Sequence, residues 1–355
     1  MKRIIFIILL VVVFCLTLCS CSQDDDDDND AGDDDDDDDD DSFVGSWWIE
    51  SVDEIAGTYQ EFKKSSIATS LGGKPQILYF LMGQESVLKR ALLADTQWIR
   101  EVLFLDLSFI GFPSIELDSN NKAHFSIQQS YNNAKYDDIT VLSYASNEAG
   151  IWVVDVVDSG GLLTNNLGAS NSLAIDTKNN IHISYSSGGD GEGQYSRLNY
   201  INNVNGSWVN EGNDQCPLPE LSSGGFSSIV LDSDDIVHIA HAGCDENNIC
   251  QRYVTTNDGW HGECVPDTEY RVNQSSIAVD HDGRVFIAYN LDMSYKHIFS
   301  LHIGYKSEDE WTSDLIDPQI SHLCRELSDS YLGLDGEGNA HIAYTGLDDE
   351  DIPVL

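Results

Sequence analysis

The chain has 355 residues, of which 41% are hydrophobic, enough to form the core of one large or two ordinary domains. Its formal net charge is −43. A surface this acidic repels nucleic-acid phosphates and anionic lipid headgroups. We therefore expect no nucleic-acid partner and no membrane attachment through basic patches.

Residues 1–20 have the layout of a secretory signal peptide. Lys2 and Arg3 precede an apolar run over residues 4–18, which is shorter than the ~20 residues that span a bilayer. The letters LCSC that end this segment resemble a bacterial lipobox. That resemblance implies cleavage before Cys21 and acylation of this cysteine, so we expect the membrane to be a partner through a lipid anchor.

Two alternatives stay open at this end of the chain. Cys19 is a second candidate for acylation, although a bulky leucine precedes it, and an ordinary signal peptide with a chance cysteine would leave no lipid. Ser22 follows Cys21 where some lipoproteins carry an aspartate, and this favours the outer membrane of a two-membraned bacterium.

Residues 21–42 are predicted to be the lipidated cysteine followed by a disordered acidic tether. Fifteen aspartates lie between Asp24 and Asp41, and the segment has no large apolar side chain to bury. Charge repulsion extends such a chain, to about 70 Å at ~3.4 Å per residue. Clustered carboxylates can collect Ca²⁺, but a flexible tract offers no fixed cage, so we favour a spacer and expect no other cofactor.

From Phe43 onward one phrase recurs every ~50 residues. Its copies are SIELDSNNKAHFSI from Ser114, SLAIDTKNNIHISY from Ser172, SIVLDSDDIVHIAH from Ser228, SIAVDHDGRVFIAY from Ser276, YLGLDGEGNAHIAY from Tyr331 and the degenerate SIATSLGGKPQILY from Ser66. A tryptophan recurs out of phase with it, at Trp47, Trp98, Trp152, Trp208, Trp260 and Trp311. Two markers with one period indicate an internal repeat.

Each repeat contains four segments with the period-2 alternation of strands, separated by Gly, Asn and Asp turns. Four strands per ~50 residues is typical of a β-propeller blade. We therefore predict an all-β domain over residues 43–355, a six-bladed propeller of four-stranded blades. The strand from Gly45 resembles the one from Gly206 and is predicted to complete the last blade as a clasp. A truncated sequence would instead allow a seventh blade.

The repeat resembles that of bacterial and archaeal secreted proteins built from S-x-A-x-D-x-x-G-x-x-H-I-A-Y units, which are grouped loosely with sialidase-like propellers. The resemblance covers about 290 residues. It implies the propeller fold and no particular activity.

The repeated polar residues are interpreted as structural. An aspartate that opens a hairpin turn can bind the backbone N–H groups two residues on, and these are Asp118, Asp176, Asp232, Asp280 and Asp335. A histidine begins the returning strand at His124, His182, His238 and His341 and is expected to tie to that carboxylate or to a carbonyl. A ring of metal ligands is the alternative, but a propeller holds these histidines apart, so we expect no metal site.

Candidate functional residues are those that depart from the repeat and those in the polar loops between second and third strands, because packing explains the consensus residues but not the exceptions. His241 stands where other repeats have a tyrosine. The polar loops are expected to begin at Gln128, Ser186, Asn290 and Thr345. Exposed tyrosines with acidic and amide groups suit a glycan or an envelope protein. The candidate ligand-binding residues are Tyr131, Tyr136, Asp190, Glu192, His241, Asp245, Tyr295, His297 and Asp348.

The sequence favours a binding or scaffold module over an enzyme. No GxSxG, HExxH or glycine-rich phosphate loop occurs, and after the signal the chain has only seven arginines, none at a repeated strand start, where a sialidase needs a cluster. No catalytic residue is assigned. A carbohydrate-active enzyme of the sialidase-like class is the alternative, but the chain has so many acidic residues that no facing pair of carboxylates stands out as catalytic.

Five cysteines follow the anchor, and export favours disulfides. Cys244 and Cys250 flank one loop and are the predicted pair. Cys216, Cys264 and Cys324 follow the tryptophan strands, and one of these three must be left over. A metal site is the alternative, although the spacing lacks CxxC.

Overall fold

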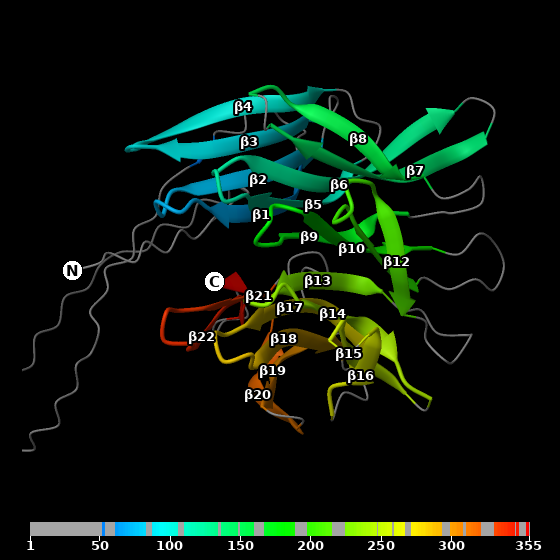
Figure 1. Cartoon of the computed structure of the whole chain (residues 1–355). Coiled ribbons are helices and arrows are strands. Elements are labelled where there is room, and N and C mark those ends of the chain that lie inside the picture. The colour runs from blue at the N-terminus through cyan, green and yellow to red at the C-terminus, as the bar shows by residue number, and fades with distance from the viewer. Residues whose placement is uncertain are drawn as a thin grey trace, which may run out of the picture. The chain divides into compact units, whose positions relative to one another are not determined.

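A computed structural model describes seventeen stretches of the chain: residues 52–53, 61–82, 87–105, 110–133, 136–147, 150–159, 167–188, 197–214, 224–246, 248–257, 259–266, 271–292, 299–307, 310–320, 330–344, 346–347 and 353–354. The chain divides into two units, Met1–Ala56 and Gly57–Leu355, and every strand belongs to the second. The described residues form strands and turns without a helix (Figure 1). Among them, therefore, no helix is available that could cross a membrane.

Five four-stranded antiparallel sheets follow one another along the chain, each a simple meander (Figure 1). Sheet 1 comprises β1 (Glu61–Thr69), β2 (Pro75–Met82), β3 (Val87–Ala94) and β4 (Gln97–Leu105). Sheet 2 comprises β5 (Ile110–Leu117), β6 (Ala123–Asn133), β7 (Tyr136–Ser146) and β8 (Val153–Asp158). Sheet 3 comprises β9 (Ala169–Ile175), β10 (Ile181–Ser187), β11 (Arg197–Asn202) and β12 (Val209–Asp214).

Sheet 4 comprises β13 (Gly225–Leu231), β14 (Val237–Cys244), β15 (Ile249–Thr255) and β16 (His261–Cys264). Sheet 5 comprises β17 (Arg271–Val279), β18 (Val285–Asp292), β19 (Phe299–Ser307) and β20 (Glu310–Ile320). The sixth repeat contributes the pair β21 (Ser330–Leu334) and β22 (Ala340–Tyr344), followed by the short pair β23 (Gly346–Leu347) and β24 (Pro353–Val354). The described part of the chain thus bears out the expected four strands per repeat in five repeats.

The first strands of successive repeats pack side by side in the order β1, β5, β9, β13, β17 and β21. Apolar clusters fill the space between neighbouring sheets. Ile115 of β5 packs against sheet 1, and Ile277 of β17 packs against sheet 4. Ala68 of β1 lies in the same cluster as Ile115, and Ala240 of β14 lies in the same cluster as Ile277, so bulky side chains of one sheet meet small ones of the next.

Three of the recurring tryptophans, Trp208, Trp260 and Trp311, join their sheet to the preceding one. Trp208 packs edge-on against Tyr144 with ring centroids 5.1 Å apart, and Trp311 does the same with Tyr253 at 5.4 Å. Gly212 allows a similar approach for Trp260, because a Cβ at that glycine would lie 3.0 Å from the indole ring. The 50-residue marker in the sequence is therefore a contact between sheets.

The structure bears on two predicted features, the loop after Gln128 and the clasp strand from Gly45. Residues 128–138 were expected to form a loop, but β6 and β7 continue through most of this segment and pair as far as Asn133 with Tyr136. The expectation of a loop over the whole segment is wrong, because the backbones of the two strands stay paired almost to the end of the hairpin. The predicted clasp strand from Gly45 lies outside the described residues, apart from its last two.

Candidate functional site

One pocket brings the first strands of all six repeats together. Its volume is about 140 Å³, and it is lined from β1, β5, β9, β13, β17 and β21. Serines from all six strands line it, together with Asn171 and Gln274. Pro113, Phe226 and Tyr331 supply apolar surface, and among the described residues that line it none carries a charged side chain. The site is thus a polar, uncharged recess.

The first serine of each repeat connects the strands around this pocket. Its Oγ accepts a hydrogen bond from the backbone N–H of the next first strand. The bonds run from Ile115 to Ser66 (3.1 Å), Leu173 to Ser114 (3.0 Å), Ile229 to Ser172 (3.3 Å), Ile277 to Ser228 (3.3 Å) and Leu332 to Ser276 (3.0 Å). A hydroxyl has one donor and two acceptor sites, so each bond occupies only one of them.

Two residues of the lining, Ser170 and Phe226, adopt left-handed backbone conformations, with φ of 49° and 54°. Such values are uncommon for residues other than glycine and are strained for a bulky one. Phe226 lies two residues after Gly224, whose N–H donates to the Ala242 carbonyl over 2.9 Å. A Cβ at Gly224 would lie 2.3 Å from the backbone nitrogen of Leu198. This glycine therefore allows the bulge that carries Phe226 into the pocket wall.

The five repeated aspartates hold the turns between first and second strands. In each, Oδ1 accepts the N–H groups of the residues two and four positions on, over 2.7–3.0 Å. The residue three positions on has positive φ and is Asn121, Asn179, Asp235, Gly283 or Gly338. In the degenerate first copy Ser70 takes the aspartate's place, and its Oγ accepts the N–H of Lys74.

Three of the four repeated histidines form buried arrays with the turn aspartate and a tyrosine of the third strand. The fourth, His341, is exposed, with its Nε2 3.2 Å from Asp335 Oδ2. His238 has its Nε2 3.3 Å from Asp232 Oδ2 and its Nδ1 2.7 Å from the Tyr253 hydroxyl. The same arrangement joins Asp118, His124 and Tyr144 in sheet 2 and Asp176, His182 and Tyr200 in sheet 3, with His–Asp distances of 3.6 Å. The tyrosine partner was missed from the sequence, although it recurs in the third strands β7, β11 and β15.

The ionisation of these arrays follows from burial. Desolvation lowers the pKa of His182 and His238, although the paired aspartates oppose it. Desolvation also raises the pKa of Tyr253 to about 12. The tyrosine is therefore the donor to Nδ1, and the neutral imidazole presents Nε2–H to the carboxylate. For Asp176, burial alone would raise the pKa, but bonds from Asn180 and Lys178 bring it below its ordinary value.

These arrays have the connectivity of an activated nucleophile, but they are closed to substrate. The tyrosines Tyr144, Tyr200 and Tyr253 are no more than 8% exposed and pack on tryptophans of the next sheet. Within the part of the chain that the structure describes, no three His, Cys, Asp or Glu side chains come together as metal ligands. The arrays are thus structural ties.

The tyrosine that ends the repeated phrase also serves packing. Tyr185 and Tyr289 are completely buried. The Tyr185 hydroxyl donates to Asp158 of the preceding sheet over 2.5 Å, and Tyr344 donates to Asp317 of the preceding sheet over 3.1 Å. These side chains join sheets.

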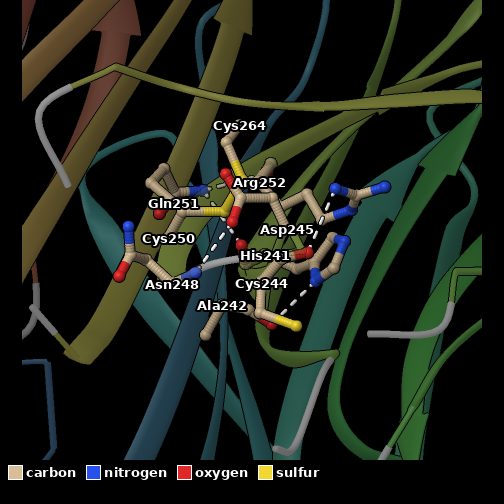
Figure 2. The surroundings of a disulfide bond; sticks show 9 residues. All are labelled: His241, Ala242, Cys244, Asp245, Asn248, Cys250, Gln251, Arg252 and Cys264. Atoms are coloured by element: carbon tan, nitrogen blue, oxygen red, sulfur yellow. Dashed lines mark hydrogen bonds between the residues drawn. A yellow bond between two sulfur atoms is a disulfide. The ribbon is translucent and has the colours of Figure 1, made fainter. Parts of the chain in front are cut away.

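The structure describes four of the nine candidate ligand-binding residues. His241 is completely buried, with Nδ1 3.2 Å from the nitrogen of Gly224 and 2.8 Å from the carbonyl oxygen of Ala242 (Figure 2). The expectation that His241 contacts a ligand is corrected, because its surface is used in packing. Asp245 closes the tight turn after β14, where its Oδ1 accepts the N–H of Asn248 over 2.8 Å.

The other candidates do not form a described cluster. Tyr131 and Tyr136 lie in β6 and β7, close to the end of that hairpin. Five candidates lie outside the described residues, namely Asp190, Glu192, Tyr295, His297 and Asp348. The serine-lined pocket itself was not predicted. A serine at the start of a strand looks like a packing residue in the sequence, and only the folded chain brings the six strands together around one pocket.

The predicted disulfide is wrong. Cys250 of β15 bonds to Cys264 at the end of β16, with their Cα atoms 5.8 Å apart (Figure 2). Cys244, the predicted partner, takes part in a disulfide of its own. Cys244 and Cys250 lie on adjacent strands, but in the ladder Cys250 stands opposite Gly243 and Cys244 opposite Ile249, so the two cysteines are offset. Closeness in sequence was a poor guide to the pairing.

No protein-family model and no curated protein sequence matches the chain. Solved structures do. A protein of unknown function from Dyadobacter fermentans aligns with 80% of the chain and 93% of its own length, at 9% identity and a TM-score of 0.55. A mutant Aleuria aurantia lectin in complex with Fucα1-6GlcNAc aligns over 82% and 91%, at 12% identity and a TM-score of 0.50.

A mutant of Trypanosoma rangeli sialidase with trans-sialidase activity aligns with 82% of the chain at 10% identity and a TM-score of 0.50. The chain spans about half of that sialidase chain, 53%. At such identities the likeness is one of fold. Together with the successive four-stranded meanders, it identifies a propeller-like fold.

Proposed function

We propose that the chain is a cell-envelope lipoprotein whose propeller domain binds a ligand, with a glycan as the favoured class. The observation that carries this proposal is the uncharged pocket at the six first strands. Its hydroxyl and amide groups offer hydrogen bonds, and its two aromatic residues offer surface for stacking. Such a combination suits recognition of a polyhydroxyl molecule.

Binding is favoured over turnover by the chemistry of this lining. Glycoside hydrolysis needs a carboxylic acid and a carboxylate on either side of the scissile bond. The pocket lining contains serine, asparagine, glutamine, proline, phenylalanine and tyrosine. The Asp–His–Tyr arrays, which have acid and base groups, are buried between sheets. The carbohydrate-active enzyme is therefore kept as an outcome of the test.

The proposal includes six blades, with the strand from Gly45 as a clasp in the last. Support comes from the six first strands that line one pocket and from the five serine bonds that link them in order. The signal peptide over 1–20, acylation of Cys21, the tether over 21–42 and the outer-membrane location rest on the sequence alone.

The ligand class is tested with the full chain in detergent. It is applied to an array of neutral and acidic glycans, and the same glycans are incubated with the protein and examined for cleavage by mass spectrometry. Saturable binding without a new product supports the proposal. Cleavage would assign the enzyme instead, and an array without any binding would reject glycans as the ligand class.

The anchor is tested separately, by expressing the chain in a two-membraned bacterium fed an alkyne analogue of palmitate. Labelling that is lost in Cys21→Ser and kept in Cys19→Ser supports acylation of Cys21. Labelling lost only in Cys19→Ser would move the anchor to Cys19, and an unlabelled wild-type chain would contradict the lipoprotein.

A further inference from the structure

We propose that the serine-lined pocket is a site for a single neutral sugar ring, held by hydroxyl groups of the first strands and stacked on Phe226 or Tyr331. This deepens the proposed function and rests on it, since it names the ligand class and places the ligand at a defined location. The proposal has four supports: the hydroxyl ring, one unpartnered hydroxyl, the aromatic surface, and the size and charge of the pocket.

The first support is the ring of hydroxyl groups. The first serines of five repeats each accept an N–H from the neighbouring strand, and none donates its own O–H to a protein acceptor among the described residues. All five line the pocket. A ligand with oxygen acceptors can use these donors, and its own hydroxyls can use the remaining lone pairs.

The second support is Ser330, which is 0% exposed and lines the pocket. Its Oγ has no hydrogen-bond partner, whereas the residues at the same position in three earlier repeats, Asn171, Ser227 and Ser275, are bonded. Ser126 donates to Asn171 over 2.6 Å, and Ser184 donates to Ser227 over 3.1 Å. Ala240 of β14 and Ala288 of β18 stand where β6 and β10 carry those serines. Ser275 donates instead to Gln251 over 2.7 Å, whereas Ser330 has no such substitute partner.

An unpartnered buried hydroxyl costs stability unless another molecule satisfies it. Ser330 shares its pocket with polar groups of the five other first strands. A hydroxyl of a bound ligand can therefore complete the pairing that the protein leaves open at this one repeat.

The third support is the aromatic surface. Phe226 lines the pocket with a left-handed backbone, a conformation that persists where the surroundings impose it and that tends to occur at ligand sites. Tyr331, at the start of β21, is 48% exposed and lines the same pocket. Aromatic faces bury the C–H faces of a sugar, while the ring's hydroxyls reach the polar lining.

The fourth support is size and charge. A cavity of about 150 Å³ is known to hold one benzene molecule, so a pocket of about 140 Å³ fits one six-membered ring better than an oligosaccharide. The net charge of −43 disfavours an anion, and the lining residues that the structure describes offer no carboxylate to a cation. A neutral ring that both donates and accepts hydrogen bonds is the remaining match.

The test measures binding of glucose, galactose, mannose, fucose and N-acetylglucosamine to the full chain in detergent by calorimetry, with N-acetylneuraminic acid and sulfate as anionic probes. Ser330→Ala removes only the unpartnered hydroxyl. Phe226→Asn removes the ring but keeps a residue that tolerates positive φ. Ser300→Ala is the matched control, because Ser300 is equally buried but bonds to His302 away from the pocket.

We expect at least one neutral sugar to bind. Ser330→Ala should weaken it roughly five-fold, the loss of one hydrogen bond, and Phe226→Asn roughly ten-fold, while the melting temperature stays within a few degrees of wild type. Ser300→Ala should lower the melting temperature and leave affinity unchanged.

Three results would overturn the site. Glycan binding that is unaltered in Ser330→Ala and Phe226→Asn would leave the proposed function standing and place its site elsewhere. Tighter binding of sulfate or N-acetylneuraminic acid than of every neutral sugar would reject the ligand class. A chain that binds neither the array glycans nor these sugars would reject the proposed function together with the site.

Discussion

Glu116 is the residue at which the repeat's packing rule is broken. It lies on β5, where the corresponding residues in three other first strands are Ala68, Ala174 and Ala278. Desolvation raises the pKa of Glu116 to about 7, and the bond to the Leu117 N–H opposes it only in part. A carboxyl group that is held neutral in the folded state favours folding at low pH. That preference disappears as the pH rises through the folded pKa.

We therefore expect Glu116→Gln to match the wild type near pH 4 and to be more stable by about 2 kcal/mol at pH 8, because the amide carries no charge to bury. Chemical denaturation at both pH values measures the difference. Glu116→Ala, which installs the repeat's own residue, should show the same trend. A constant difference across pH would show that the carboxyl group does not titrate in this range.

The buried histidines respond to pH with the opposite sign. Their pKa values are lowered by desolvation, so the folded state disfavours their protonation. The neutral histidines therefore contribute fully to stability above the pKa of a histidine in the unfolded chain, about 6.5. This contribution is lost as the pH falls below that value.

Replacing His182 or His238 by Gln should therefore flatten the fall in melting temperature between pH 7 and pH 5, even though each variant starts from a lower value at pH 7. Melting curves at half-unit pH intervals test this. His281→Gln is the control, since that side chain is 70% exposed. An unchanged slope in both buried variants would mean that other groups govern the acid limb.

At the scale of the element, the turn between first and second strands is built from one carboxylate. Asp176 accepts two backbone N–H groups with one oxygen and the Asn180 amide with the other. The degenerate copy shows what remains when the residue is shortened, because Ser70 still accepts the N–H of Lys74.

Asp176→Ala should lower the free energy of unfolding by about 2 kcal/mol, since two N–H groups lose their acceptor. Asp176→Ser should lose roughly half as much, because a hydroxyl can take one of them as Ser70 does. Urea denaturation gives both values. Equal losses would show that the turn depends on the carboxylate's charge and not on its hydrogen bonds.

Local chemistry explains why some of this fold could be predicted from the sequence. An aspartate with a positive-φ residue three positions later makes its turn within five residues, and the alternation of Ser172 to Ile175 identifies a strand. Ser330 could not be identified in this way. Its place in the pocket and its lack of a hydrogen-bond partner depend on residues far away in sequence, such as Ala288, 42 positions earlier, and on five other strands that line the same pocket.

The cysteines illustrate the same limit. Cys250 lies 14 positions from Cys264 and only six from Cys244, so sequence distance favours the wrong partner. The strand pairing decides which cysteines can meet. Cys264 stands opposite Arg252, which is two residues from Cys250 and on the same face of the sheet. Cys244 stands opposite Ile249, which is one residue from Cys250 and on the other face.

At the scale of the whole molecule, the disulfide closes a short loop within sheet 4. Closure of a loop of about 15 residues is worth about 3 kcal/mol through the unfolded state. The double variant Cys250→Ser/Cys264→Ser should lose about this much stability, and peptide mapping of the wild type should recover the two cysteines in one linked pair. A link between Cys244 and Cys250 would contradict the structure.

The serine bonds that join first strands have a consequence for the history of such a chain. Each serine needs only a backbone N–H from its neighbour, and every residue except proline supplies one. A gene segment that encodes one repeat can therefore be copied, deleted or exchanged without losing this set of bonds, whichever side chain the adjacent first strand carries there. These bonds place no demand on the side chains of the adjacent first strand, so selection can change those side chains without breaking the connection between first strands.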